Sequence, residues 1–294
     1  MLEHGDNLGN AGALTAGDIQ WMTAARGIIH RELAFRNERA HTVQLWVNLP
    51  GELKMAGTRY QDLRAVDRPV IERDGIRIDL ISGNVGGAAG PAQNYWPVTG
   101  TLITLEPGRS LEHLLPGRDR AFFYVLSGAV TVAGRPVRAG QIAWSDPVPG
   151  AAVTTIALAA ADGDRESVVM AYSGQPIGWP IGQPVVMGGP FVMNTKTEIT
   201  QAFSDFHSGK FGDIPPPGPP EVPLNPARDG DGYAARAELN TSRYSREWCW
   251  SAGHLKFVVD VDGPQGHPGG ADHRVVFGPG SHVAGERDDA VLGV

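Results

Sequence analysis

The chain has 294 residues with a formal net charge of −7, and no run of lysine or arginine offers a surface to nucleic acid or to an anionic membrane. Its single cysteine, Cys249, excludes an intrachain disulfide and a cysteine-based zinc site. No stretch approaches the ~18 consecutive apolar residues of a membrane-spanning helix, and the first residues lack the basic segment and apolar core of a signal peptide. We therefore expect a cytoplasmic protein that binds neither a membrane nor, directly, nucleic acid.

Frequent turns separate short strands along the first part of the chain, which is consistent with 39 glycines and 23 prolines. The clearest strand covers residues 42–49, which are rich in β-branched and aromatic residues and stop at Pro50. In residues 76–81 the apolar side chains alternate with polar ones, as on a strand with one buried face. We predict strands at 18–22, 27–32, 42–49 and 76–81.

A second group of strands follows a crossing rich in glycine, alanine and proline at residues 82–98, which we interpret as a domain junction. Turn signals such as Ser127-Gly128 recur beyond it at the spacing that is typical of a sandwich or a barrel. We predict strands at 101–105, 121–126, 129–132, 141–144, 152–158 and 167–172, with Val137 in another.

One helix is predicted after these strands. Thr195 and Glu198 have the spacing of a capping box, in which each side chain binds the backbone N–H of the other residue. Behind them Ile199, Ala202 and Phe206 recur at helical spacing. We expect this helix to pack its apolar stripe on a sheet.

The composition changes after Asp213. Residues 214–220 are mostly proline, which favours a stiff, extended linker. The remainder has little hydrophobic periodicity, apart from a run at 254–261 that could form an isolated strand. We predict that most of residues 213–294 is disordered or loosely attached.

Several short motifs follow one another in an order that is specific to one family. They are His4-Gly5-Asp6-Asn7-Leu8-Gly9-Asn10, Gly17-Asp18-Ile19-Gln20-Trp21-Met22-Thr23-Ala24, Gly27-Ile28-Ile29-His30-Arg31-Glu32, Gln44-Leu45-Trp46-Val47-Asn48-Leu49-Pro50, Arg59-Tyr60-Gln61-Asp62, Ala121-Phe122-Phe123-Tyr124-Val125-Leu126-Ser127-Gly128 and Gly189-Pro190-Phe191-Val192-Met193-Asn194-Thr195. This succession resembles the pirin family over roughly residues 1–213.

The resemblance implies an all-β fold, namely a double cupin of two β-barrels (jelly rolls) with one C-terminal helix packed on the barrels. Residues 1–88 would then belong to the N-terminal cupin and residues 89–212 to the C-terminal cupin. The Pro/Gly-rich tail at 213–294 has no counterpart in the family.

The resemblance also implies a metal site. Pirins hold one metal, usually iron, in the N-terminal cupin, with three histidines and one glutamate as ligands. Two of these ligands come from a His-Pro-His segment, and the other two from a His-x-Glu segment that corresponds to His30 and Glu32 here. We therefore expect one divalent transition metal, with Fe(II) as the first candidate. Some members of the family oxidise the flavonol quercetin with dioxygen, whereas others are regulatory binding proteins.

The sequence departs from the family at the His-Pro-His segment, which does not precede His4. The nearest imitation, His267-Pro268, lies in the tail and has the wrong surroundings. We therefore expect an N-terminally truncated member whose first barrel is incomplete and which carries half of the ligand set.

His30 and Glu32 also suit a metal on chemical grounds. Residues two apart on a strand project to the same face, and nitrogen and oxygen donors bind first-row transition metals. A mononuclear oxygenase site needs two histidines and a carboxylate, so metal binding should be weak or absent unless another residue substitutes. His4 and His41 are the nearest candidates, and we interpret both as loop histidines.

The second cupin carries Glu112 and His113, which cannot easily chelate one metal because adjacent residues on a strand face opposite sides. We expect a structural or surface role for both. Four aromatic residues could line a flavonoid pocket but are more simply core residues, since aromatics in strands usually pack: Trp21, Trp46, Phe122 and Tyr124.

These observations leave three hypotheses. The chain is a metal-dependent dioxygenase acting on a quercetin-like flavonol, with His30 and Glu32 as ligands. Alternatively, it is a non-enzymatic regulatory protein that binds a protein partner, because the ligand set is incomplete and no other catalytic motif stands out. In the third hypothesis it is an inactive truncated member, or its true start lies upstream.

Overall fold

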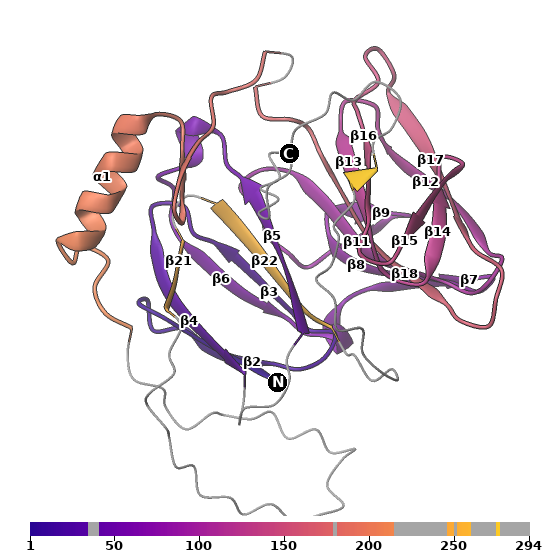
Figure 1. The fold of residues 1–294 in the computed structure, drawn as a ribbon, viewed down its shortest axis with the longest axis horizontal. Helices are drawn as coiled ribbons and strands as arrows, with labels where there is room; N and C mark the ends of the chain where they lie inside the picture. Colours follow the sequence, from indigo (N-terminus) through magenta and orange to yellow (C-terminus); the bar gives the residue numbers. More distant parts are fainter. Residues whose placement is uncertain (35–40, 179–180, 215–245, 250–251, 260–274, 277–294) are drawn as a thin grey trace, which may run out of the picture. The chain divides into compact units, whose positions relative to one another are not determined.

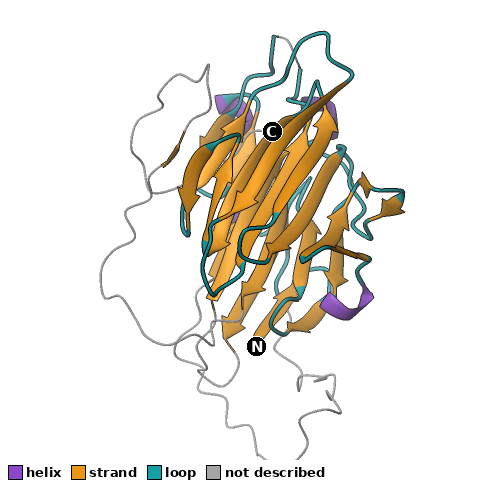
Figure 2. Ribbon diagram, turned by 90° about the vertical axis from the view of Figure 1, so that its right-hand side faces the viewer, coloured by secondary structure: helices purple, strands orange, loops and turns teal. Residues whose placement is uncertain are grey.

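The computed structural model describes residues 1–34, 41–178, 181–214, 246–249, 252–259 and 275–276. These residues form many strands, which Figure 2 shows in orange. They also form one α-helix, α1 (Lys196–His207), which is labelled in Figure 1. The chain divides into two compact units. Unit 1 contains Met1–Leu45, Gly51–Arg64 and Pro184–Val261, and unit 2 contains Trp46–Pro50, Ala65–Gln183 and Asp262–Val294. No helix in the described part of the chain is long and apolar enough to cross a membrane.

Unit 1 is built on two four-stranded sheets and a hairpin. The first sheet has the order β2-β1-β4-β21, the second β5-β22-β3-β6, and the hairpin is β19-β20. Their bounds are β1 Leu2–Asp6, β2 Ala11–Leu14, β3 Ile19–Thr23, β4 Ile28–Ala34, β5 His41–Asn48, β6 Arg59–Leu63, β19 Val186–Gly188, β20 Phe191–Met193, β21 Arg246–Cys249 and β22 Ala252–Val259.

Two strands of the C-terminal segment belong to these sheets. β21 pairs with β4, and β22 pairs with β3, both in antiparallel register. Figure 1 shows β22 alongside β3. A strand was predicted at 254–261, but it is paired and not isolated. The predicted disorder of residues 213–294 falls mostly on residues outside those that the structure describes.

Unit 2 has a seven-stranded sheet of order β23-β16-β13-β18-β11-β8-β7, a four-stranded sheet of order β12-β17-β14-β15, and the short pair β10-β9. The bounds are β7 Val70–Arg73, β8 Ile76–Ser82, β9 Asn84–Val85, β10 Ala88–Ala89, β11 Val98–Leu105, β12 Ser110–Pro116, β13 Arg120–Ser127, β14 Ala129–Val132, β15 Arg135–Arg138, β16 Ile142–Ser145, β17 Val153–Ala160, β18 Ser167–Gly174 and β23 Val275–Val276.

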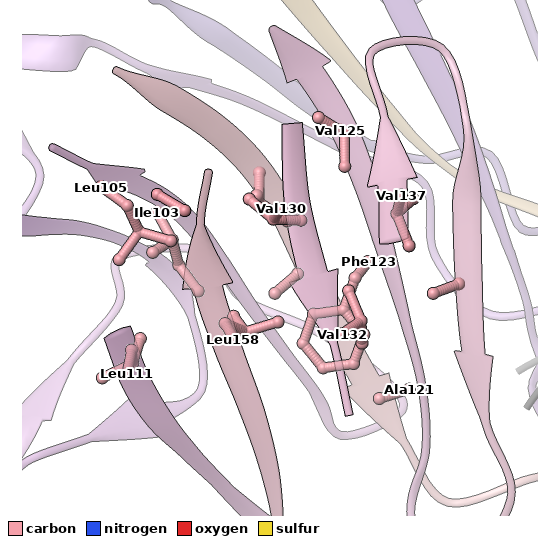
Figure 3. Packing of buried hydrophobic residues seen from close by; sticks show 14 of the residues in the cluster. Ile103, Leu105, Leu111, Ala121, Phe123, Val125, Val130, Val132, Val137 and Leu158 are labelled. Carbon is pink, nitrogen blue, oxygen red and sulfur yellow. The ribbon is translucent and has the colours of Figure 1, made fainter. Parts of the chain in front are cut away.

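The core of unit 2 joins both of its larger sheets. Its buried side chains are almost all aliphatic, with Phe123 as the aromatic member, and they come from alternate positions of strands in each sheet (Figure 3). β12 shows the pattern most simply, because exposed and buried residues alternate along its whole length. The burial of the two apolar faces against each other is the main stabilising contribution in this unit.

The sequence predicted the position of most strands with a clear apolar alternation. β3, β4, β5 and β8 confirm the four strands expected in the first part of the chain, and β11, β13, β14, β15, β16, β17 and β18 confirm those expected in the second part. The strands that it missed are β1, β2, β6, β7, β9, β10, β12, β19, β20, β21 and β23. The domain boundaries expected at residues 88 and 212 stay a prediction.

The helix α1 begins with the predicted capping box. The N–H of Glu198 donates to Thr195 Oγ1 at 3.2 Å, and the N–H of Thr195 donates to Glu198 Oε2 at 2.7 Å. Ile199 and Ala202 are buried against the hairpin strand β20, in a cluster with Phe191 and Met193. The predicted apolar stripe therefore packs on the β19-β20 hairpin.

Candidate metal centre

Two neighbouring strands of unit 1 bring four ionisable side chains to one face. In the antiparallel register of β1 and β4, His4 lies opposite Glu32 and Asp6 lies opposite His30. Directly opposite residues share a face of the sheet, as do residues two apart on one strand. His4, Asp6, His30 and Glu32 are therefore neighbours although 25 residues lie between the two histidines in the sequence.

Three of these side chains converge closely enough to hold one ion. His4, His30 and Glu32 each offer a ligand atom, and these atoms lie within 4.8 Å of one another. The two imidazole centroids are 5.5 Å apart, and His30 Nδ1 lies 3.5 Å from Glu32 Oε1. Two histidines and one carboxylate make the facial set of non-haem iron oxygenases.

The group is removed from solvent. His4 is 4% exposed and His30 is 0% exposed, and the side chain of Glu32 is 4% exposed. Burial, together with the nearby His30, lowers the pKa of His4 despite its contact with Asp6. His4 is thus neutral at physiological pH, and the neutral imidazole is the form that binds metals. Its Nδ1 is buried and has no hydrogen-bond partner among the described residues.

Asp6 orders the turn that joins β1 to β2. Its Oδ1 accepts the N–H groups of Leu8 and Asn10, each at 2.9 Å, and its Oδ2 accepts from Asn10 Nδ2 at 2.7 Å. Burial alone would raise the pKa of Asp6, but the hydrogen bonds from His4 and Asn10 outweigh it, and the pKa lies below its ordinary value. Asp6 is therefore an anion that faces His4.

Tyr60 of β6 covers the other side of His4. The two rings stack with centroids 4.6 Å apart and planes 21° apart, and the Tyr60 hydroxyl donates to Asp62 Oδ1 at 2.7 Å. Burial and the neighbouring Asp62 raise the pKa of Tyr60, so the hydroxyl stays protonated. Gly12, which lies opposite His4 on β2, makes room for this arrangement, because a Cβ there would lie 2.6 Å from the Tyr60 hydroxyl.

The comparisons with known proteins agree with this architecture. The sequence model of the pirin family matches residues 1–47, and that of the pirin C-terminal cupin domain matches residues 101–212. Pirin-1 of Arabidopsis thaliana is 34% identical over 209 residues, which are 71% of this chain and 71% of that protein. Human pirin is 34% identical over 211 residues, 72% of this chain and 71% of that protein.

This chain belongs to the pirin family. The bicupin fold that the resemblance implied is confirmed by these matches and by the all-β structure with one C-terminal helix. A crystal structure of quercetin 2,3-dioxygenase from Acinetobacter baumannii aligns with a TM-score of 0.57 and 29% identity, covering 73% of each chain. We predicted from the sequence that the first pirin barrel is incomplete. The match to residues 1–47 does not test this, so it stays a prediction.

The structure brings the two predicted pirin ligands together. His30 and Glu32 lie on one face of β4, as their spacing predicted, and their role as ligands stays a prediction. The interpretation of His4 as a loop histidine is wrong, because His4 lies within β1 and is buried beside them. His41 begins β5, and its side chain lies outside the described part of the chain.

The sequence contained one signal for the position of His4. Asp6-Asn7-Leu8-Gly9-Asn10 is rich in turn-forming residues, and Leu2 and Leu14 lie at equal distances on either side of it. These leucines pair across β1 and β2 and bury each other. A hairpin could thus have been predicted, but Gly5 and the polar residues of β1 have low strand propensity.

The second pirin cupin keeps its predicted character. Glu112 is exposed and His113 is buried, so they face opposite sides of β12. His113 meets Phe123 edge to face at 5.6 Å.

Trp21 and Phe122 are buried as core residues, whereas Tyr124 is half-buried. Among the described residues, the cluster in unit 1 is the only group of three or more potential ligands within reach of one ion.

Proposed function

We propose that this pirin holds one divalent transition metal on His4, His30 and Glu32, and that it is a metal-dependent dioxygenase acting on a quercetin-like flavonol. The observation that supports the proposal is the convergence of two histidines and a glutamate, buried and within 4.8 Å of one another. In this proposal His4 is the third ligand, beside His30 and Glu32, which were the two that the sequence analysis identified. Two histidines and one carboxylate are the minimum set of a mononuclear oxygenase site.

The donor chemistry fits Fe(II). Imidazole nitrogens and a carboxylate oxygen suit first-row transition metals, and a facial set of three leaves positions open for exogenous ligands. When bound, iron supplies the one-electron chemistry with dioxygen that protein side chains lack. The protein's own contribution is a neutral His4, a carboxylate that balances part of the metal's charge, and a location from which water is largely excluded.

The alternative is a regulatory protein that binds a protein partner and uses the metal structurally. Its support is the number of ligands, because the resemblance implies three histidines and one glutamate, whereas this cluster holds two histidines and one glutamate. A changed ligand set can retain the metal and lose the reaction.

Oxygen consumption with quercetin decides between these proposals. The protein is loaded anaerobically with Fe(II), and uptake is compared with that of metal-free protein and of His30→Ala. We expect uptake in the loaded wild type alone. If the wild type binds one iron per chain and consumes no oxygen, the dioxygenase proposal is wrong and the regulatory alternative gains support.

A further inference from the structure

The contact between Asp6 and His4 determines which nitrogen of His4 is available to a ligand. Asp6 Oδ2 lies 3.4 Å from His4 Nε2, and both side chains are 0% exposed. The other contacts of the Asp6 carboxylate are the donors of the turn, namely two backbone N–H groups and the amide of Asn10. Asp6 is outside the three-residue ligand group, and its oxygens are already engaged.

An ionised carboxylate can only accept hydrogen bonds. The contact at 3.4 Å is therefore a hydrogen bond only when His4 carries its proton on Nε2. In the neutral imidazole the other nitrogen then holds the lone pair. That nitrogen, Nδ1, is the buried atom that has no hydrogen-bond partner among the described residues.

We infer that Asp6 is a positioning residue that fixes His4 in the Nε2–H tautomer and leaves Nδ1 as the nitrogen that can bind a metal. The metal part of this inference rests on the proposed function. Carboxylates that bind the remote nitrogen of a ligating histidine fix its orientation and raise its basicity, and their loss lowers metal affinity about 10- to 100-fold.

Asp6→Asn is a sharp test, because it keeps the turn and reverses the polarity at His4. The carbonyl oxygen of the new side chain can still accept the N–H groups of Leu8 and Asn10, while its amide nitrogen takes the place of Oδ2 and donates to His4 Nε2. The hydrogen bond that Asp6 Oδ2 accepts from Asn10 Nδ2 is lost in this variant, because an amide nitrogen cannot accept it. Asn10→Ala is the matched control, since it removes one hydrogen bond to Asp6 Oδ2 without changing the group that faces His4.

The first readout needs no metal. Long-range proton–nitrogen NMR spectra of the metal-free protein at pH 7.5 report the tautomer of His4, which is assigned by comparison with His4→Gln. We expect Nε2–H in the wild type and in Asn10→Ala, and Nδ1–H in Asp6→Asn. An Nδ1–H tautomer in the wild type, or an unchanged tautomer in Asp6→Asn, would overturn the inference.

The second readout is the affinity for Co(II), a spectroscopically visible substitute for Fe(II). We expect Asp6→Asn to bind Co(II) about 10- to 100-fold more weakly than the wild type, with Asn10→Ala close to the wild type. Equal affinities of wild type and Asp6→Asn overturn the positioning role. If the wild type binds no Co(II) or Fe(II) while the tautomer still responds to Asp6→Asn, the proposed metal function fails and the tautomer assignment stands.

Discussion

At the scale of single residues, the two cupins use buried histidines in different ways. His4 and His30 lie together beside a carboxylate, whereas His113 is buried on the same face of β12 as the core residues Leu111 and Leu115 and meets Phe123 edge to face. The first arrangement brings imidazole nitrogens and a carboxylate together, and these are donor types that first-row transition metals bind. The second gives a side chain that the fold tolerates only without charge.

His113 should make the folded protein sensitive to acid. Burial lowers its pKa from 6.5 to about 4, so between these pH values the unfolded chain binds a proton that the folded chain does not. Stability contributed by neutral His113 is present above pH 6.5 and is lost as pH falls toward 4. From pH 7.5 to pH 5 we expect a loss of about 2 kcal/mol.

The measurement is the free energy of unfolding by urea at both pH values, for the wild type and for His113→Leu. Every other titrating group is common to the two proteins, so the difference in their pH dependence reports His113. Parallel pH profiles would show that His113 does not carry the acid sensitivity.

Tyr60 should support His4 through its ring and not through its hydroxyl. The stack at 4.6 Å holds the imidazole plane, while the hydroxyl binds Asp62 on the far side. We expect Tyr60→Phe to retain Co(II) affinity and Tyr60→Leu to lose about 10-fold, as for other residues that orient metal ligands. The reverse order of affinities in a Co(II) titration would contradict this role.

At the scale of elements, the sequence revealed strands from two kinds of local signal. Alternating apolar and polar residues predicted β8, an apolar run that ends at the turn signal Ser127-Gly128 predicted β13, and the capping box identified the start of α1. β1 was missed because its residues are mostly polar and face a site, so its burial depends on pairing with β4. The candidate ligand group was predicted only in part. His30 and Glu32 lie two apart on one strand and can be recognised locally, whereas the position of His4 beside them follows from the pairing of β1 with β4.

The capping box gives a local prediction for α1. Thr195→Ala removes the acceptor for the N–H of Glu198 and should destabilise the first turn by about 1 kcal/mol. Hydrogen exchange of the amides of α1 is the readout. Thr200→Ala, an exposed change within the same helix, is the control and should leave their protection intact, because alanine is the better helix former. Equal protection in Thr195→Ala and the wild type would show that the cap contributes little.

At the scale of the whole molecule, the C-terminal segment contributes strands to the unit that contains the site. β21 pairs with β4, the strand that carries His30 and Glu32, and β22 pairs with β3. A Pro-rich stretch precedes both strands, and the sequence pattern gave no indication that residues so distant would pair with the N-terminal strands. Periodicity identifies a strand but does not identify its partner.

A chain that ends at Ile214 should therefore be less stable than one that ends at Val261. The shorter chain loses β21 and β22 and leaves the backbone groups of β3 and β4 without these partners. We expect its melting temperature to fall by more than about 5 °C relative to the longer chain, together with faster hydrogen exchange in β3. Equal melting temperatures would show that the two C-terminal strands do not stabilise unit 1.

The central claim is that His4, His30 and Glu32 together hold one metal ion, and metal content per chain tests it most directly. Elemental mass spectrometry is applied to protein purified without chelators, for the wild type, His4→Ala, His30→Ala and His113→Leu. We predict about one transition metal per chain in the wild type and in His113→Leu, which lies outside the cluster, and loss of the metal in the other two variants. A wild type without metal, or a His4→Ala variant that retains it in full, would contradict the account.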